Sequence, residues 1–216
     1  MIVSVQEKLA LSAPTKKLIQ HHLELGGMIA FPTDTLYGFG VKAGNRSGVD
    51  LLYRLKNRNE SKPLIMMGSD KNQFIPYISD SSQLNQAIFD EVWPGPLTVV
   101  MPFRKETGLY FCPKPSASIG FRIPNLPILL DLLSYLSFPL LTTSANLSGE
   151  ETYTEGKSIQ NWLLTRSSEP AIVLDGGKLQ NSPSTVISLN SSSSFTLLRS
   201  GSLSIEKIAS FFPEKK

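Results

Sequence analysis

The sequence has few of the residues that mark a disulfide framework, a metal site or a catalytic triad. Among its 216 residues there are one cysteine, Cys112, and two histidines, His21 and His22. A single cysteine cannot form an intrachain disulfide, which favours a reducing compartment, and an inert buried thiol is its simplest interpretation. Adjacent histidines on a helix point in different directions, and no acidic or cysteine partner stands at metal-ligand spacing. Side-chain metal chemistry and Ser-His-Asp catalysis are therefore not expected.

Long apolar runs are also missing. No stretch approaches about 18 uninterrupted apolar residues, and the N-terminus lacks the pattern of a secretion signal. Charged residues make up 18% of the chain, and the formal net charge is only +3. This small basic excess is compatible with an anionic ligand but does not establish one. With 41% hydrophobic residues, we expect one globular, cytoplasmic domain over residues 1–216 that does not associate with membranes.

Two short glycine motifs resemble nucleotide-binding signatures but lack the required context. Residues 38–43 read "GFGVKA", yet a loop is expected after them, whereas the dinucleotide fingerprint must open a helix. Residues 155–158 read "EGKS", but the P-loop glycine that should stand five positions before Gly156 is absent. Neither a dinucleotide fold nor a P-loop is predicted.

Apolar periodicity predicts alternating helices and strands. Helices are expected over residues 14–25, 48–58, 81–93, 126–136, 158–165 and 204–212, and strands over residues 28–33, 63–68, 97–103, 117–124, 138–144, 171–177, 184–189 and 195–201. Several strand pairs lack an intervening helix, which indicates an α/β fold with a mixed sheet. Ser47 and Asp50 resemble a capping box for the second helix. The apolar face of the first helix is expected to contain Leu18, Ile19, His22 and Leu23.

Polar segments stand at the ends of the predicted elements or interrupt them. They are "PTDTLYG" (residues 32–38), "KNRNESKPL" (residues 56–64), Arg122 in "SIGFRIP", "TTSANLS" (residues 142–148), and Ser184-Thr185 with Arg199. If the cations Lys56, Arg58, Arg122 and Arg199 converge, they form a site for a polyanion. An unpaired charge inside an apolar strand is costly, so Arg122 requires either a ligand or an ion-pair partner.

Each of these segments also has a simpler local interpretation. Lys56 and Arg58 could interact only with a helix C-terminal dipole, and Ser144 with Asn146 could form a cap or an Asx-turn. Thr35, Ser184 and Arg199 could be ordinary turn or surface residues. No general base is evident among the segments. Attack of a carboxylate-like oxygen on the α-phosphate of ATP needs none, because positioning and charge neutralisation can carry it.

Taken together and in order, seven segments resemble the YrdC-like family of threonylcarbamoyl-AMP synthases. They are "FPTDTLYGFG", "KNR" followed by "KPLIMM", "WPGPLTVV", "IGFRIP", "TTSANLSG", "STVISL" and "LLRSG". The resemblance implies a twisted open α/β sheet with flanking helices around a large, positively charged cavity. It implies that ATP, L-threonine and bicarbonate give threonylcarbamoyl-AMP and pyrophosphate, with Mg²⁺ accompanying ATP and no tightly bound metal. A tRNA threonylcarbamoyl transferase complex would use the product to modify adenosine 37.

The same resemblance implies roles for individual residues. The positions that match threonine contacts are Thr35, Arg122, Thr142 and Ser184. The positions expected on the ATP side are Arg58, Lys62, Ser118, Ser144, Asn146, Thr152 and Arg199. Lys56 and Arg58 form the KxR pair and are the expected catalytic residues, with Lys56 neutralising phosphate. We therefore expect these side chains to surround one cavity.

Two positions depart from the family pattern. Some members have a histidine that contacts threonine where this chain has Met67, and an asparagine that contacts ATP where it has Lys62. The chain resembles the short form of the family, without the second domain of longer members. Two alternatives stay open, a paralogue acting on another substrate and an RNA-binding module. Little aromatic interleaving with Lys and Arg argues against the latter, although weak RNA binding could be a secondary property.

Overall fold

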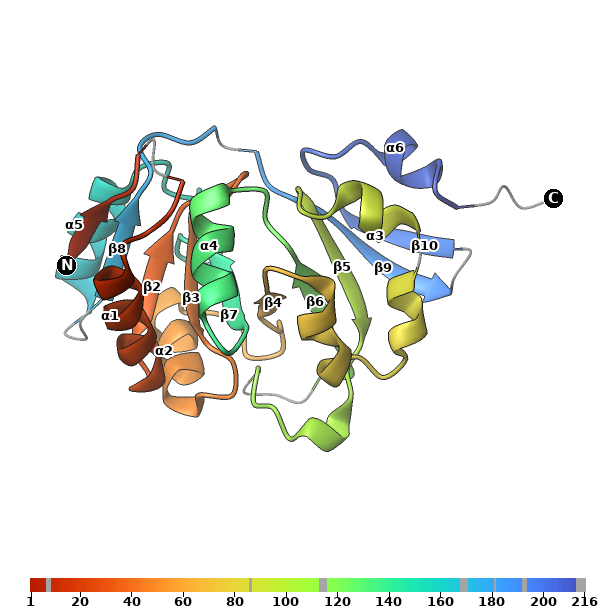
Figure 1. Cartoon of the computed structure of the whole chain (residues 1–216), viewed down its shortest axis with the longest axis horizontal. Coiled ribbons are helices and arrows are strands. Elements are labelled where there is room, and N and C mark those ends of the chain that lie inside the picture. Colours follow the sequence, from red (N-terminus) through yellow and green to blue (C-terminus); the bar gives the residue numbers. More distant parts are fainter. Residues whose placement is uncertain are drawn as a thin grey trace.

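One mixed sheet runs through the molecule from end to end (Figure 1). The computed structural model describes residues 1–6, 9–85, 87–112, 116–167, 171–180, 182–191 and 194–212. Its strands are β1 (Ile2–Ser4), β2 (Met28–Phe31), β3 (Gly38–Lys42), β4 (Ile65–Met67), β5 (Leu97–Pro102), β6 (Ser118–Arg122), β7 (Leu140–Ser144), β8 (Ala171–Asp175), β9 (Thr185–Ser191) and β10 (Ser194–Arg199). The strand order is β1-β8-β2-β3-β7-β4-β6-β5-β9-β10, with both parallel and antiparallel neighbours. The predicted mixed α/β architecture is confirmed.

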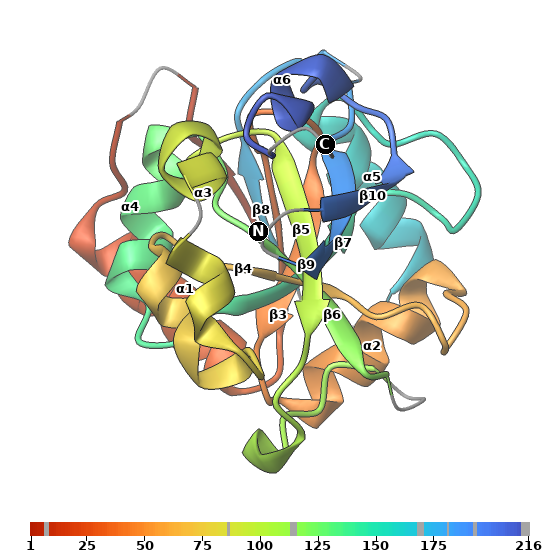
Figure 2. The same ribbon diagram turned by 90° about the vertical axis from the view of Figure 1, so that its right-hand side faces the viewer.

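Helices cover the sheet on both faces. They are α1 (Ala13–Glu24), α2 (Arg46–Lys56), α3 (Ala87–Val92), α4 (Pro127–Tyr135), α5 (Gly156–Arg166) and α6 (Ile205–Ala209), with 3-10 helices at Lys71–Tyr77, Ser81–Asn85 and Lys105–Thr107. One hydrophobic cluster joins α1 and α4 to one face of β2, β7 and β8. A larger cluster joins α2 and α5 to the opposite face and continues under α3. Figure 2 shows how the strand direction changes along the sheet as it twists. None of the helices described has both the length and the apolarity needed to cross a membrane.

Several local predictions need correction. Leu18 is 46% exposed, whereas Ile19 and Leu23 of the same helix are fully buried, so the buried face is narrower than the sequence indicates. Helix α2 is capped by Asn45, whose side chain accepts a hydrogen bond from Gly48 N at 3.0 Å, and not by Ser47. The helix predicted over residues 81–93 is a 3-10 turn followed by the short α3.

Strand β3, which contains two glycines, was not among the predicted strands. A glycine is needed at position 40, because a Cβ atom there would come within 2.7 Å of Phe31 Cε1. The missing side chain lets the Phe31 ring lie against β3, which pairs with β2 on one side and β7 on the other. Residues 38–42 therefore belong to the sheet and form no phosphate-binding loop.

Candidate active site

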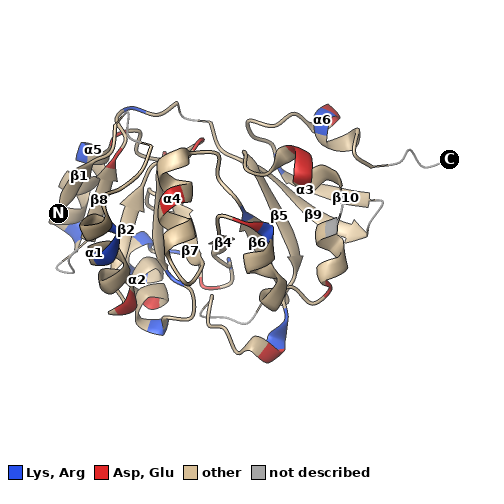
Figure 3. Ribbon diagram, viewed as in Figure 1, with Lys and Arg blue, Asp and Glu red and all other residues tan. Residues whose placement is uncertain are grey.

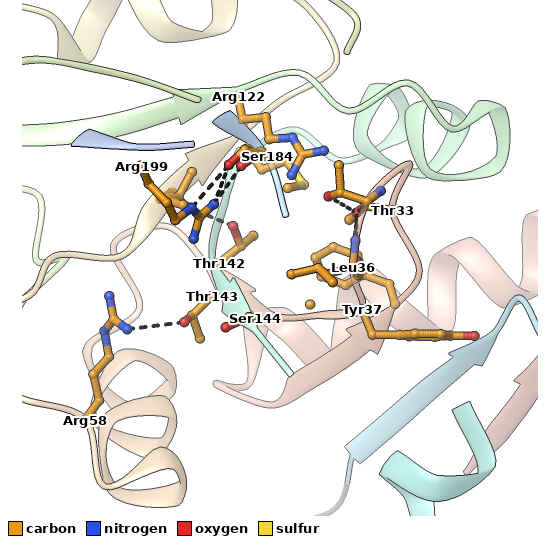
Figure 4. A pocket seen from close by; sticks show the side chains of 15 residues that line it. Thr33, Leu36, Tyr37, Arg58, Arg122, Thr142, Thr143, Ser144, Ser184 and Arg199 are labelled. Atoms are coloured by element: carbon orange, nitrogen blue, oxygen red, sulfur yellow. Dashed lines mark hydrogen bonds between the residues drawn. The ribbon is translucent and has the colours of Figure 1, made fainter. Parts of the chain in front are cut away.

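A cavity that opens to solvent lies over the centre of the sheet. Its wall brings together seven of the predicted site residues: Thr35, Arg58, Arg122, Thr142, Ser144, Ser184 and Arg199 (Figure 4). Other wall residues include Phe31, Thr33, Leu36, Tyr37, Ile65, Met67 and Thr143. Segments from residue 31 to residue 199 therefore meet at one place.

Strand register explains why the central side chains share the cavity. Thr142 of β7 lies opposite Ile65 of β4, and Ser144 lies opposite Gly38 of β3. Paired residues in neighbouring strands point to the same face, and so do residues two apart in one strand. Thr142 and Ser144 thus project from the same face of the sheet, and α1 and α4 pack against another part of this face. Because Gly38 has no side chain, the Phe31 ring can lie against it at the cavity wall.

The turn after β2 is organised by Thr33. Its hydroxyl accepts hydrogen bonds from the backbone N–H groups of Thr35 (3.0 Å) and Leu36 (3.1 Å), and donates to Leu36 O at 2.7 Å. This network presents Thr35, which is only 4% exposed, at the cavity wall. Tyr37 anchors the turn by donating to Gly177 O at 2.7 Å, and burial raises its pKa to about 12. The sequence motif "PTDTLYG" was recognised, but only Thr35 was named from it.

Arg122 has an ion-pair partner that the sequence did not identify. Its Nη2 donates to Asp34 Oδ1 at 2.6 Å, and the two side chains are only 7% and 12% exposed. Within the described residues, Arg122 Nε and Asp34 Oδ2 are buried without a hydrogen-bond partner. Burial lowers the pKa of Arg122, and the Asp34 carboxylate opposes this change. Arg122 thus has the ion-pair partner that its place in an apolar strand requires, and this partner belongs to the turn that Thr33 organises.

Arg199 is held by the start of β9. Its Nε and Nη2 donate to Ser184 O at 3.2 and 2.8 Å, and Nη2 also donates to Ser184 Oγ at 3.0 Å. Behind it, Ser184 Oγ shares a 3.0 Å hydrogen bond with Thr98 Oγ1, and Thr98 is fully buried. The quoted segment "WPGPLTVV" contains Thr98, which was not named as a site residue. A buried threonine of β5 thus holds the serine that orients Arg199.

Arg58 reaches the cavity from the end of α2. The helix ends at Asn57, which adopts the left-handed conformation with φ 48°, and the chain turns toward the sheet. Arg58 then donates to Lys62 O at 3.1 Å, to Pro63 O at 2.9 Å and, more weakly, to Thr143 Oγ1 at 3.4 Å. All three acceptors are uncharged, so its positive charge has no carboxylate partner among the described residues.

Lys56 is placed differently, although it stands only two residues before Arg58. It is 1% exposed and does not line the cavity. Its ammonium group donates to Ser144 O, to Asn146 O at 2.6 Å and to Asn146 Oδ1 at 2.8 Å. Burial, and secondarily the charge of Arg58, lower the pKa of Lys56 to about 7. The ammonium group therefore binds oxygens of Ser144 and Asn146, about 90 residues further along the chain, and does not interact only with the C-terminus of α2.

Asn146 completes this arrangement. Its Oδ1 also accepts a hydrogen bond from Ser144 Oγ at 2.6 Å, and its Nδ2 donates to Glu150 O at 2.6 Å. We call Lys56, Ser144, Asn146 and the Glu150 carbonyl the buried junction. Ser144 belongs to both the junction and the cavity wall. The hydrogen bond to Asn146 therefore orients the Ser144 hydroxyl at the cavity.

The remaining predicted residues lie outside the cavity wall. Lys62 is exposed, and it is the backbone oxygen of Lys62 that contacts Tyr53 and Arg58. Ser118 begins β6 and Arg122 ends it, so they are about 13 Å apart along the strand. Asn146 and Thr152 do not line the wall either, whereas Met67 does. The ATP contacts expected for these residues stay predictions.

Known proteins resemble this chain over most of its length. A family model for Sua5, YciO and YrdC proteins, described as telomere recombination, matches residues 21–201. A putative threonylcarbamoyl-AMP synthase of Methanocaldococcus jannaschii is 36% identical over 189 residues, covering 85% of this chain and 84% of the relative. The threonylcarbamoyl-AMP synthase of Mus musculus is 30% identical over 201 residues, covering 89% of this chain and 69% of the relative.

A solved structure agrees in fold with almost all of the chain. The crystal structure of P. abyssi Sua5 complexed with L-threonine superposes with a TM-score of 0.84 at 26% sequence identity. The match covers 99% of this chain but only 61% of the Sua5 chain. The chain thus spans less than two thirds of that solved relative, while it spans most of the archaeal and mouse relatives.

Proposed function

We propose, because this chain belongs to the Sua5/YciO/YrdC family, that it is an L-threonylcarbamoyladenylate synthase. It would form threonylcarbamoyl-AMP and pyrophosphate from ATP, L-threonine and bicarbonate. The observation that carries this proposal is the convergence of Arg58, Arg122 and Arg199 with neutral hydroxyl groups on one cavity. Such a wall suits a ligand that is strongly anionic at one end and zwitterionic at the other.

The two ends of the wall suit the two larger substrates. Arg58 and Arg199 are bound only to carbonyl and hydroxyl oxygens in the described structure, so their charge is available to the ATP phosphates. Arg122 is paired with Asp34, and an arginine beside a carboxylate suits the carboxylate and ammonium of an amino acid. Thr35, Thr142 and Ser184 offer hydroxyl groups for orientation. We assign threonine to the Arg122 end and the nucleotide to the Arg58 and Arg199 end.

The chemistry needs two steps. First, the ammonium group of zwitterionic threonine loses one proton to solvent, and the resulting amine displaces hydroxide from bicarbonate; a second nitrogen proton leaves with that hydroxide as water, and a carbamate remains. Second, a carbamate oxygen attacks the α-phosphorus of ATP, the bond from that phosphorus to the bridging oxygen breaks, and pyrophosphate leaves. The second nucleophile is already an anion and needs no general base. Positioning and neutralisation of the charge that develops on phosphate are the contributions expected from the arginines.

Mg²⁺ is proposed to enter with ATP. No group of three or more His, Cys, Asp or Glu side chains is placed to hold a metal ion in the described parts of the chain. Mg²⁺ keeps much of its hydration and commonly binds through substrate phosphates. ATP oxygens and water are therefore its proposed ligands, with the arginines neutralising the remaining charge.

We further propose that the product passes to a tRNA threonylcarbamoyl transferase complex and that the reaction takes place in the cytoplasm. Cys112 is a buried free thiol that donates to Glu60 O at 2.8 Å, which fits a reducing compartment. Lys and Arg residues are interspersed with acidic ones over the ribbon (Figure 3). This dispersed charge favours the synthase over a dedicated RNA-binding module, although weak RNA binding stays compatible with it.

Pyrophosphate release tests the proposal directly. Purified protein with ATP, Mg²⁺, bicarbonate and L-threonine should release pyrophosphate, and omission of threonine should abolish the release. Pyrophosphate that never depends on threonine would overturn the assignment. Replacing threonine by serine, alanine or valine separates a threonine enzyme from a paralogue with another amino-acid substrate. RNA binding that falls steeply with salt, without pyrophosphate release, would support the RNA-binding alternative.

A further inference from the structure

The three arginines of the cavity differ in their partners. Arg122 donates to a carboxylate at 2.6 Å, that of Asp34. Arg58 and Arg199 donate only to carbonyl and hydroxyl oxygens within the described residues. The Arg122–Asp34 pair itself therefore has no net formal charge, whereas Arg58 and Arg199 each carry a positive charge without a carboxylate partner among the described residues.

The Arg122–Asp34 ion pair is poorly hydrated. The side chains of Arg122 and Asp34 are 7% and 12% exposed, and one polar atom of each is buried without a partner among the described residues. A carboxylate that bound Arg122 alone would add one negative charge to this neutral, poorly hydrated ion pair, which is unfavourable. A ligand that brings an ammonium group together with its carboxylate would keep the total at zero.

We propose that Asp34 is a positioning residue that cancels the charge of Arg122 and so makes this end of the cavity select a free, zwitterionic α-amino acid over a simple carboxylate. This inference rests on the proposed function, because it assumes that an amino acid binds at Arg122. Asp34 itself is not part of the cavity wall. It acts through the guanidinium that it orients and through its charge, which extends beyond direct contact at low effective dielectric.

The electrostatic surroundings of Arg122 are consistent with this role. Burial lowers the pKa of Arg122, the Asp34 carboxylate raises it, and the charge of Arg199 lowers it again. Asp34 is therefore the group that favours the charged guanidinium against two opposing influences. If the ion pair only stabilised the fold, its loss would weaken the binding of all ligands of the cavity equally.

Ligand preference, and not activity, provides the test. Calorimetry on the intact protein would compare L-threonine with 3-hydroxybutyrate, which keeps the carboxylate and hydroxyl of threonine but lacks the ammonium. The wild-type protein should prefer threonine by at least tenfold. In Asp34→Asn this preference should fall about tenfold, equivalent to about 1.4 kcal/mol, because the negative charge that favours the ammonium is gone. Asp34→Glu, which keeps the charge, should restore much of the preference.

A matched control exists between α1 and α4. Lys16 and Asp131 also form a 2.6 Å ion pair, and neither residue lines the cavity. Asp131→Asn should leave the preference for threonine unchanged.

Two results would overturn the proposal for Asp34 alone: an Asp34→Asn protein with unchanged preference, or a wild-type protein that binds 3-hydroxybutyrate as tightly as threonine. The second result is obtained without any variant, so it remains decisive if Asp34→Asn fails to fold. Wild-type protein that neither binds threonine nor releases threonine-dependent pyrophosphate would overturn the proposed function together with it.

Discussion

Lys56 and Arg58 stand two residues apart, yet they belong to two different regions. Lys56 lies in the buried junction, and its ammonium is bound to oxygens of Ser144 and Asn146. Arg58 lies at the cavity wall and donates to uncharged oxygens. Asn57, which lies between them, adopts the left-handed conformation and ends α2, so the two side chains point in different directions. A shared sequence motif thus contains one cation that builds the site and one that is available to a ligand.

Removal of the cavity cation should have the largest effect on activity. Arg58→Met is expected to lower kcat/KM for pyrophosphate release by about 100- to 1,000-fold, as for other groups that stabilise developing charge. Its free energy of unfolding should change by no more than about 1 kcal/mol, because its hydrogen bonds are partly exposed. Steady-state kinetics and urea unfolding measure the two quantities.

Arg54→Met is the control for this substitution, since Arg54 is exposed on α2, the helix that precedes Arg58. It should change neither quantity appreciably. A folded Arg58→Met protein with near wild-type activity would contradict the assignment of Arg58 to the nucleotide end of the cavity.

Removal of the junction cation should instead destabilise the fold. Lys56→Met leaves Ser144 O, Asn146 O and Asn146 Oδ1 without their buried donor. The free energy of unfolding should fall by about 3 kcal/mol, measured by urea denaturation. The exposed Lys157 offers a control, because Lys157→Met should be nearly neutral. Unaltered stability of Lys56→Met would show that the junction does not hold the loop as described.

Ser144 connects the two regions, so its removal should affect both moderately. In Ser144→Ala the cavity loses a hydroxyl, and Asn146 Oδ1 loses a 2.6 Å hydrogen bond. The KM for ATP should rise about tenfold, while the free energy of unfolding should fall by about 1 kcal/mol. Ser148→Ala, at an exposed position of the same loop, serves as the control. If stability falls but the KM for ATP is unchanged, Ser144 belongs to the junction alone.

A smaller, pH-dependent effect should also originate in the junction. The pKa of Lys56 is lowered to about 7 by burial and by Arg58, whereas an unfolded lysine titrates near 10.4. Between these values the unfolded chain binds more protons at this position, so raising the pH favours the folded state. From pH 6 to pH 8 the contribution is on the order of 1 kcal/mol. The difference in unfolding free energy between wild type and Lys56→Met should increase in this direction, and a decrease would refute the lowered pKa.

Much of the fold was accessible from local patterns. Apolar periodicity located the helices α1, α2, α4 and α5 and most strands to within a few residues. Strand β3 was missed because glycine lowers strand propensity, whereas here it accommodates the Phe31 ring. The cap of α2 was assigned to Ser47 and not to Asn45, because several residues of suitable type stand close together there.

Some residues of the candidate site were predicted correctly and others were not, because local patterns do not show which distant residues meet. Arg58, Arg122, Ser144 and Arg199 were expected around one cavity, and all four line it. Lys56 was expected beside them, but charge type alone does not say in which direction a side chain points. Asp34 was overlooked because its partner lies 88 residues away and no local pattern connects them.

By itself, the sequence determined most of the elements, the family and the chemical types of the site residues. These depend on periodicity, turn residues and motifs whose order along the chain is visible directly. Only the tertiary structure decided which cations remain available and which are neutralised or enclosed. That outcome depends on how strands, turns and helix ends pack together, which brings Arg122 to Asp34 and Lys56 to Asn146, and on burial, which makes an unpaired charge costly. Whether a cation binds a ligand or supports the fold is thus a property of its surroundings.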